Sequence, residues 1–209
     1  MITLFIDTSL DFVTTALVRD KELLSIKQEN IPNMHSVYAT SYIKKVLDEA
    51  NIDANNIDKL MVVNGPGSFT GVRIGVTIAK TYGYLIKKNV TPISSLKAMA
   101  VSKEHTGNIM TLISARRNNY YMGLYDKDNN EIVEEQFIDG NKILELIEKY
   151  NPEIVSNEFS VLGTYKINKV NLDVLKVVEY YLDKEEINHH KLVPNYLKLP
   201  QVLEKWLKK

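Results

Sequence analysis

The sequence has 209 residues, a formal net charge of zero and no cysteine. Its length suits one compact domain or two small lobes, and 44% hydrophobic and 25% charged residues are ordinary for a globular protein. The missing cysteines exclude disulfides and thiolate metal sites, and the balanced charge argues against a chain that holds nucleic acid by its own field.

The first hundred residues alternate between strand and helix patterns. Apolar runs predict a meander of three strands around a polar turn at 19–22. A helix is expected from Met34 to Ala50, because its apolar residues recur at helical spacing. The expected elements are, in order, strands at 2–7, 13–18 and 23–28, the helix at 34–50, a strand at 59–64, a helix to about Lys88, a strand at 90–93 and a helix from about Ser95.

The second half repeats this order with little residue identity. Strands are expected at 108–115, 119–126 and 132–138, a helix at 141–150 and a strand at 152–159. The repeat predicts two α/β lobes of similar topology, 1–105 and a smaller 106–209. A short basic helix is expected around Trp206, and whether this last helix packs back on the body is left open.

Missing patterns argue against a membrane protein and against a metal site. No apolar run approaches the length of a transmembrane helix, and the N-terminal residues lack the basic region of a signal peptide. We therefore expect a cytoplasmic protein. No two histidines are spaced as i, i+3 or i, i+4, so no metal site is predicted.

Four of the nine glycines fall in the segment NGPGSFTGVRIG at 64–75. The segment matches neither a Walker A loop nor the G-x-G-x-x-G pattern, so its phosphate-binding signal is weak. Small residues recur at i+4 spacing along the helix that follows, although each helical glycine costs about 1 kcal/mol relative to alanine. Two explanations stay open: close packing on the protein's own sheet, or contact with a helix of another subunit. The small residues are Gly67, Gly71, Gly75, Ala79 and Gly83.

The helix at 34–50 carries a second feature of an interface. Tyr38 and Tyr42 are one turn apart and lie mostly off its apolar face, and exposed aromatic residues are enriched at interfaces. The alternative is a pair of surface tyrosines whose apolar edges are covered by their own chain. Two such helices in one lobe favour a paired-helix contact.

Asp7 ends the first strand and is followed by Thr8 and Ser9. A carboxylate in this place could orient a metal-bound water or a phosphate, and the alternative is an acid that accepts hydrogen bonds from the turn amides. The corresponding place in the second lobe is near Ser114, so no second carboxylate faces Asp7. Arg116 follows it, beside a second arginine, and at most one of two adjacent strand residues can serve one site.

These motifs together closely resemble the TsaB (YeaZ) family, the accessory subunit of the bacterial machinery that makes N6-threonylcarbamoyladenosine in tRNA. The resemblance rests on GPGSFTGVRIG, on FIDTS near the start, and on HSVYATSYIKKVLDEA at 35–50. It continues through ISSLKAMA at 93–100, SARRNNYY at 114–121 and PNYLK at 194–198. It covers essentially the whole chain and is thinner after residue 100.

The resemblance implies the actin-like ATPase fold, also called the ASKHA or Hsp70 and hexokinase fold, with two duplicated lobes of which the second is trimmed. It implies that the HSVYATSY helix and the glycine-striped helix build a subunit interface. The interface residues would be His35, Tyr38, Tyr42 and the five small residues named above. Asp7, Thr8 and Arg116 would form a vestigial nucleotide pocket.

The family's catalytic relative, TsaD, carries a metal-binding His-x-x-x-His after its fifth strand, and the resemblance puts Ser95 and Met99 at those places here. Neither side chain is a ligand suited to that metal. The second lobe also lacks the paired glycines that such ATPases use against adenosine. A catalytically silent subunit is therefore implied, with no cofactor predicted in this chain alone and a nucleotide at a subunit interface left open.

Two departures from the family pattern concern the second lobe. The family commonly has Asp-Ala-Arg-Arg where this chain has SARR at 114–117, so Ser114 removes a carboxylate. The chain is also short after residue 140, which predicts a reduced second lobe.

Three hypotheses follow. The first is a scaffold that supports TsaD in transferring threonylcarbamoyl from its adenylate to the adenosine 3′ of the anticodon. Its expected partners are TsaD, the ATPase TsaE, tRNA only through the complex, and a second copy of the chain when alone. The second is an actin-fold ATPase or kinase that uses Asp7 and Thr8, and the third is a peptidase of the glycoprotease superfamily.

Overall fold

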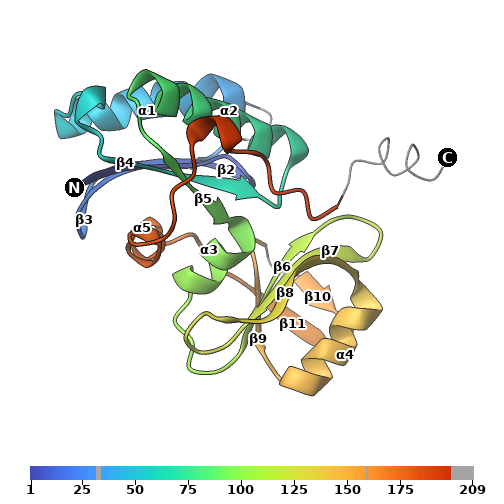
Figure 1. Ribbon diagram of the computed structural model, residues 1–209. Coiled ribbons are helices and arrows are strands. Elements are labelled where there is room, and N and C mark those ends of the chain that lie inside the picture. Colours follow the sequence, from blue (N-terminus) through green and yellow to red (C-terminus); the bar gives the residue numbers. More distant parts are fainter. Residues whose placement is uncertain (32–33, 159, 199–209) are drawn as a thin grey trace.

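The computed structural model describes residues 1–31, 34–158 and 160–198. These residues form two sheets, one above the other in Figure 1, with helices on the outer side of each sheet and two helices between the sheets. The chain builds the upper sheet first, then the lower sheet, and finally returns to the upper lobe.

The first sheet has the strand order β3-β2-β1-β4-β5. The first three strands form an antiparallel meander, and β1, β4 and β5 run parallel to one another. Because β1 and β4 are parallel neighbours, their carboxyl ends lie at the same edge of the sheet. The strands are β1 (Ile2–Asp7), β2 (Phe12–Arg19), β3 (Glu22–Asn30), β4 (Lys59–Gly65) and β5 (Val90–Ser94).

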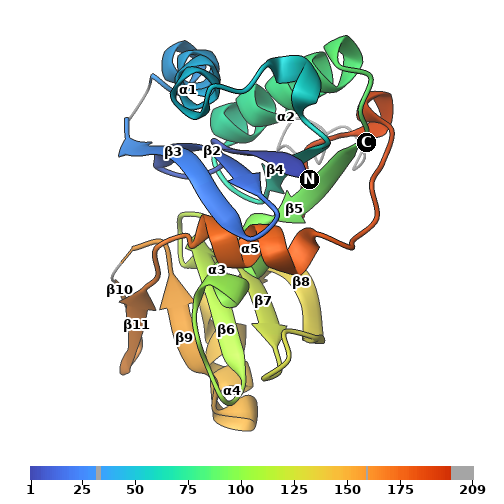
Figure 2. The same cartoon turned by 90° about the vertical axis from the view of Figure 1, so that its left-hand side faces the viewer.

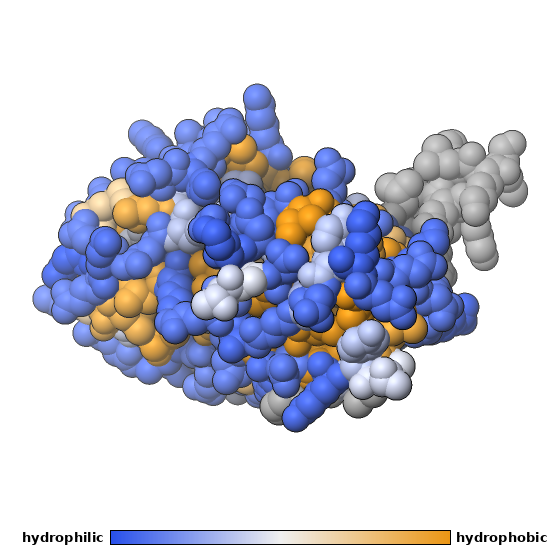
Figure 3. Space-filling model, turned by 90° about the horizontal axis from the view of Figure 1, so that it is seen from below, coloured by the Kyte–Doolittle hydropathy of each residue, from blue (hydrophilic) through white to orange (hydrophobic). Residues whose placement is uncertain are grey.

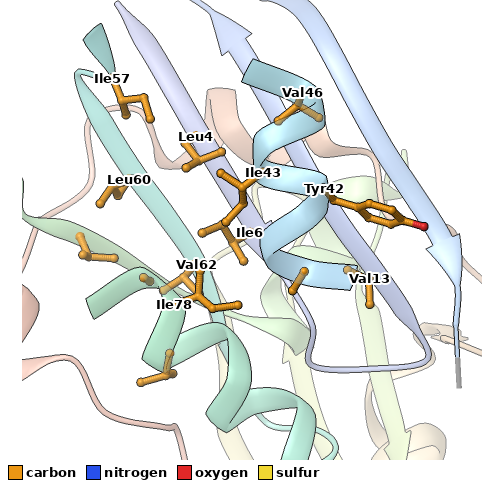
Figure 4. Packing of buried hydrophobic residues seen from close by; sticks show 14 of the residues in the cluster. Leu4, Ile6, Val13, Tyr42, Ile43, Val46, Ile57, Leu60, Val62 and Ile78 are labelled. Carbon is orange, nitrogen blue, oxygen red and sulfur yellow. The ribbon is translucent and has the colours of Figure 1, made fainter. Parts of the chain in front are cut away.

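Two helices cover the outer face of this sheet. Alternate side chains of a strand point to opposite faces, so Leu4 and Ile6 pack under the helices while Phe5 points toward the second lobe. Figure 4 shows Ile43 of the first helix pointing toward Leu4 and Ile6, with Tyr42 on the other side of the helix. The helices are α1 (His35–Ala50) and α2 (Phe69–Leu85), and a short 3₁₀ turn, η1 (Ala54–Asn56), precedes β4.

The second sheet repeats the connectivity of the first. Its order is β10-β11-β9-β6-β7-β8, with a meander of β6, β7 and β8 beside the parallel strands β9 and β11. Where the first lobe has α2, the described residues between β9 and β11 form only the short β10. The elements are β6 (Ile109–Ser114), β7 (Asn119–Tyr125), β8 (Glu131–Asp139), α4 (Gly140–Tyr150), β9 (Glu153–Ser156), β10 (Ser160–Leu162) and β11 (Tyr165–Lys169).

This duplicated topology is the actin-like ATPase fold that the sequence predicts, and the described part of the second lobe has no counterpart of α2. The second lobe is trimmed in the connection between β9 and β11, which is shorter than the α2 connection of the first lobe. None of the helices within the described ranges is long and apolar enough to cross a membrane.

The two lobes exchange the helices that lie between them (Figure 2). α3 (Ser95–Ser102) follows the last strand of the first sheet, yet its residues Leu96 and Met99 pack on the second sheet. α5 (Val174–Tyr181) follows the last strand of the second sheet, yet Val177 and Val178 pack under the first. Each sheet is therefore covered on its inner face by a helix that continues from the other.

The chain after α5 runs back along the first lobe. Ile187 forms a bridge with Val90, and Leu192 is fully buried in the core under α1 and α2. A 3₁₀ turn, η2 (His189–Lys191), lies between Ile187 and Leu192 in the sequence. Further along, the amide of Asn195 donates to the carbonyl oxygen of Asn64 at 2.7 Å. The predicted lobe boundary at residue 105 falls in the loop between α3 and β6, and the expected helix around Trp206 lies outside the described residues.

Up to residue 156 the predicted elements are found within a few residues of their expected bounds. α2 ends at Leu85 rather than Lys88, and the strand expected to reach residue 159 ends at Ser156. β10, β11 and α5 occupy a region for which the sequence analysis gives no elements.

Candidate functional site

The glycine stripe of α2 packs against the protein's own β1–β2 turn. A Cβ atom at Gly67 would lie 2.2 Å from the carbonyl oxygen of Ser9, and one at Gly71 would lie 2.1 Å from that of Thr8. The Thr8 hydroxyl donates to the carbonyl oxygen of Gly71 at 2.7 Å, and the amide of Ser68 donates to that of Ser9 at 2.7 Å. The glycines thus allow backbone-to-backbone contact, which offsets their low helix propensity.

The other small residues of the stripe are also covered by the protein's own chain. A Cβ atom at Gly75 would lie 2.7 Å from the Thr8 hydroxyl, and one at Gly83 would lie 2.7 Å from Cβ of His189 in the returning chain. Ala79 is fully buried. Of the two explanations for the stripe, the structure supports packing within the chain, and the stripe is not left free for a second subunit.

The predicted interface residues of α1 also face their own lobe. Tyr42 is 1% exposed, and half-buried Tyr38 meets it edge-on with ring centroids 5.6 Å apart. Nε2 of His35 lies 2.9 Å from the carbonyl oxygen of Leu10, which fastens the start of α1 to the β1–β2 turn. The sequence placed the tyrosines off the apolar face, but α1 packs on β2, β3 and α2 together, so its buried face is wider than one stripe.

The exposed face of α2 lies opposite the glycines. Five exposed residues recur at the same i+4 spacing as the small residues, but two positions out of phase, and two positions correspond to about 200° around a helix. Phe69 and Leu85 at its two ends are 49% and 65% exposed. The face consists of Phe69, Arg73, Thr77, Thr81 and Leu85, and we call it the outer α2 face.

One end of the outer α2 face is fixed by contacts with the returning chain. The guanidinium carbon of Arg73 lies 3.7 Å from the centroid of the Phe69 ring, a cation–π contact. Nε of Arg73 donates to the hydroxyl of Tyr196 at 2.7 Å, and the rings of Tyr196 and Phe69 stack at 5.9 Å. The sequence analysis singled out PNYLK only as a family motif, and these contacts give Tyr196 a structural role.

The exposed large hydrophobic side chains of the described residues gather on the first lobe and the returning chain. Figure 3 looks at the second-lobe end of the molecule, where polar side chains cover most of the face and apolar ones show between them. Three of the exposed residues, Phe69, Tyr84 and Leu85, belong to α2, and Met34 and Val37 lie at the start of α1. The full set is Met1, Phe12, Leu23, Met34, Val37, Phe69, Tyr84, Leu85, Val193 and Tyr196.

A cavity of about 240 Å³ lies between the lobes at the carboxyl end of β1. Asp7 lines it and is 8% exposed, with Oδ1 accepting a hydrogen bond from the amide of Ser9 at 2.7 Å. Burial raises the pKa of the Asp7 carboxyl, although the bond from Ser9 acts in the opposite direction. Polar side chains of both lobes line the cavity, namely Asp7, Asp11, Thr14, Gln28, Ser95, Asn157, Lys169 and Asn171.

Of the three residues predicted to form a vestigial nucleotide pocket, only Asp7 lines this cavity. Thr8 is fully buried and points the other way, toward Gly71, because adjacent strand residues alternate. Arg116 is exposed in the β6–β7 turn, where its backbone has a φ of 67°. Ser114 is exposed at the end of β6.

Ser95 and Met99 also line the cavity, at 2% and 4% exposure. The Ser95 hydroxyl donates to the carbonyl oxygen of Pro66, so it is already engaged by the protein. Within the described ranges no group of three His, Cys, Asp or Glu side chains is placed to hold a metal ion.

Thr14, which lies beside Asp7, and Gln28, which lies beside Thr14, are not among the residues predicted from the sequence. Register pairs Asp7 with Thr14 on β2, and Thr14 with Gln28 on β3. The β1–β2 hairpin register could have found Thr14, but counting back from the β2–β3 turn would give Lys27 instead of Gln28, because a bulge between Leu17 and Val18 shifts the register by one residue.

Sequence comparison relates the chain to proteins of one tRNA modification. A family model described as TsaD, tRNA N6-adenosine threonylcarbamoyltransferase, matches residues 28–202. The tRNA threonylcarbamoyladenosine biosynthesis protein TsaB of Bacillus subtilis is 30% identical over 225 aligned residues, which cover 99% of this chain and 98% of that protein. The protein of the same name from Escherichia coli is 30% identical over 62% of this chain and 57% of its own length.

Solved structures share the fold. YeaZ from Pseudomonas aeruginosa superposes with a TM-score of 0.76 and 19% sequence identity, covering 93% of this chain and 99% of that one. A Pseudomonas aeruginosa protein described as similar to peptidase YEAZ gives a TM-score of 0.76 at 20% identity, covering 94% and 99%. The two-lobed arrangement described above is therefore found in both.

Proposed function

The chain belongs to the TsaB (YeaZ) family, and we propose that it acts as a non-catalytic scaffold in the formation of N6-threonylcarbamoyladenosine in tRNA. In this proposal a TsaD-type subunit transfers threonylcarbamoyl from its adenylate to the adenosine 3′ of the anticodon. The present chain holds that subunit in its working geometry. The reaction would take place in the cytoplasm, where the tRNA substrate is found.

The observation that carries the scaffold role is the exposed apolar surface beside α1 and α2. A partner would cover Val37 of α1 and the outer α2 face, with Phe69 and Leu85 as apolar anchors and Thr77 near the centre. The match to a TsaD family model supports a partner of the same fold. Such a partner can present its own equivalent helices, so that two similar helix pairs meet face to face.

The same surface would join two copies of the chain when the catalytic subunit is absent, and TsaE would bind the assembled complex rather than this chain alone. The near-zero net charge supports contact with tRNA through the complex. An ATPase or kinase that uses Asp7 with Thr8 has less support, because the Thr8 hydroxyl is already bonded to Gly71 and points away from the cavity.

Reconstitution tests the function directly. TsaD and TsaE are incubated with tRNA and threonylcarbamoyl-adenylate, with and without this chain, and the modified nucleoside is quantified by mass spectrometry. We expect product only when the chain is present, since small displacements at a catalytic centre can lower rates by about a hundredfold. Full activity without the chain would overturn the proposal.

A second experiment locates the contact. Thr77→Arg puts a long charged side chain at the centre of the outer α2 face, so we expect it to abolish binding to TsaD and product formation together. Thr164→Arg makes the same change on the exposed end of the second lobe and should leave both unchanged. Circular dichroism checks that both variants fold. Equal loss in the two variants, or none in Thr77→Arg, would contradict this location.

A further inference from the structure

A row of polar side chains crosses the first sheet where the sheet faces the second lobe. Asp7, Thr14 and Gln28 stand opposite one another on β1, β2 and β3. They lie on the same side of the sheet as Phe5 and Ala16, whose side chains α5 covers. All three polar residues line the cavity, so the apolar packing gives way to a polar wall at this end of the sheet.

Two of these groups have unused hydrogen-bonding capacity. Thr14 is 1% exposed, and its buried hydroxyl has no hydrogen-bond partner among the described residues. Asp7 is 8% exposed, and its Oδ1 accepts a hydrogen bond from the amide of Ser9, whose side chain also acts on this carboxylate. Oδ2 is not among the fully buried oxygens of the described residues that lack a partner, so it can be reached from the cavity. Buried polar groups without partners are costly and uncommon in folded proteins. Oδ2 of Asp7 can accept a hydrogen bond from a molecule that enters the cavity, whereas the Thr14 hydroxyl has no accessible surface and lies within the wall.

The other walls restrict what that molecule can be. Among the described residues, the charged side chains that line the cavity are two acids, Asp7 and Asp11, and one base, Lys169 of the second lobe. A simple anion is therefore disfavoured. The uncharged lining mixes polar side chains with apolar ones, and Phe12 and Met99 are among the apolar ones. The volume of about 240 Å³ is below the usual range of ~300–1,000 Å³ for ligand pockets, which favours a small occupant.

We propose that this interlobe cavity binds a small organic molecule that carries a primary ammonium group on a short aliphatic body. The ammonium donates to the free oxygen of Asp7, and the aliphatic part lies against Met99 and Phe12. Two sources share this chemistry, a simple amine and a free amino acid. Only the amino acid has a carboxylate for Lys169.

Binding depends on pH through Asp7. Burial raises the pKa of this carboxyl, and an ammonium ion pairs only with its ionised form. Affinity for the ligand therefore increases as the pH rises through the pKa of Asp7. The charged or titratable groups near Asp7 are Asp11 and Lys169 in the cavity and His35 at the start of α1, whose charge acts to lower that pKa.

Three compounds that share the same isobutyl group test the proposal by isothermal titration calorimetry on the full chain. The first, 3-methylbutylamine, carries only an ammonium group. The second, leucine, carries an ammonium group and a carboxylate, and the third, 4-methylpentanoate, carries only a carboxylate. We expect the first two to bind and the third not to bind. Asp7→Asn should weaken both bound compounds about tenfold or more, because a hydrogen bond to a charged group is lost.

Two further variants supply a control and identify the source. Thr14→Val keeps the shape of the side chain and removes a hydroxyl that has no accessible surface, so it is the matched control and should leave the binding of both ammonium compounds unchanged. Lys169→Met should weaken leucine and spare 3-methylbutylamine if the natural ligand is an amino acid, and should spare both if it is an amine. Unchanged melting temperatures establish that these variants fold.

Several results would overturn the proposal. One is that neither ammonium compound binds, which would mean that water alone fills the cavity. The others are that 4-methylpentanoate binds as tightly as the ammonium compounds, or that Asp7→Asn binds them with unchanged affinity. Binding of Mg-ATP at this cavity with no binding of either ammonium compound would overturn it as well. None of these results bears on the scaffold role, because the cavity is distinct from the outer α2 face.

Discussion

At the scale of single residues, Asp7 has an effect on stability that can be separated from ligand binding. Its carboxyl is 8% exposed, and burial raises its pKa above the ordinary value of 3.8. A carboxyl with a raised pKa holds its proton more tightly in the folded state than in the unfolded state. Stability is therefore lost as the pH rises from about 3.8 through the pKa of folded Asp7.

The variant Asp7→Asn should accordingly be more stable than the natural chain at neutral pH. Asparagine cannot ionise, and its side-chain oxygen can still accept the hydrogen bond from Ser9. The difference should disappear below pH 3.8, where the natural carboxyl is protonated in both states. Urea unfolding across this pH range measures the effect. A variant that is less stable at neutral pH would show that the ionised carboxylate itself supports the fold.

At the scale of elements, the close contact of α2 with the β1–β2 turn depends on Gly71. A methyl group there would lie 2.1 Å from the carbonyl oxygen of Thr8, and that oxygen belongs to backbone that cannot rotate away. We expect Gly71→Ala to destabilise the protein by about 2–3 kcal/mol or more despite the better helix propensity of alanine. Thermal unfolding monitored by circular dichroism measures it.

The matched control for this substitution is Gly107→Ala. Apart from its neighbours in the chain, no atom of the described residues lies within 4 Å of a Cβ built at Gly107, so the same change should be neutral or slightly stabilising. If both variants unfold at the same temperature, the packing explanation of the glycine stripe fails.

α2 also illustrates how far the sequence could predict this structure. The helix and its small-residue stripe were visible because they depend on local spacing. The side of the helix that faces inward could not be predicted in the same way, because Gly71 and Thr77 belong to two rows of residues with the same i+4 spacing on opposite sides of the helix. That choice is made by the β1–β2 turn, whose closeness to α2 is a tertiary property. For the same reason Asp7 and Thr8 could be located at a strand end, but not assigned to a cavity and a helix contact.

At the scale of the whole molecule, the returning chain was beyond local reasoning. The valines of α5 have a helical spacing that can be recognised, but nothing local indicates that they cover the first sheet. Burial of Leu192 under α1 and α2 likewise requires the chain to cross between the lobes. The predicted division at residue 105 separates the two sheets, but the hydrophobic cores cross it, because α3 and α5 each pack on the sheet of the other lobe.

We therefore propose that the two lobes do not fold as separate domains. A fragment of residues 1–105 would lack α5 and the returning chain, which leaves Phe5 and Met61 on the inner face of its sheet without cover. The same fragment would carry α3 without the second sheet on which Leu96 packs. We expect this fragment to be unfolded by circular dichroism, and the full chain to give one calorimetric transition whose calorimetric and van't Hoff enthalpies agree. Adding residues 170–198 to the fragment through a glycine-rich linker should restore at least part of the fold, because it supplies α5 and Leu192. Two resolved transitions in the full chain, or a cooperatively folded 1–105 fragment, would show instead that each sheet can complete its own core.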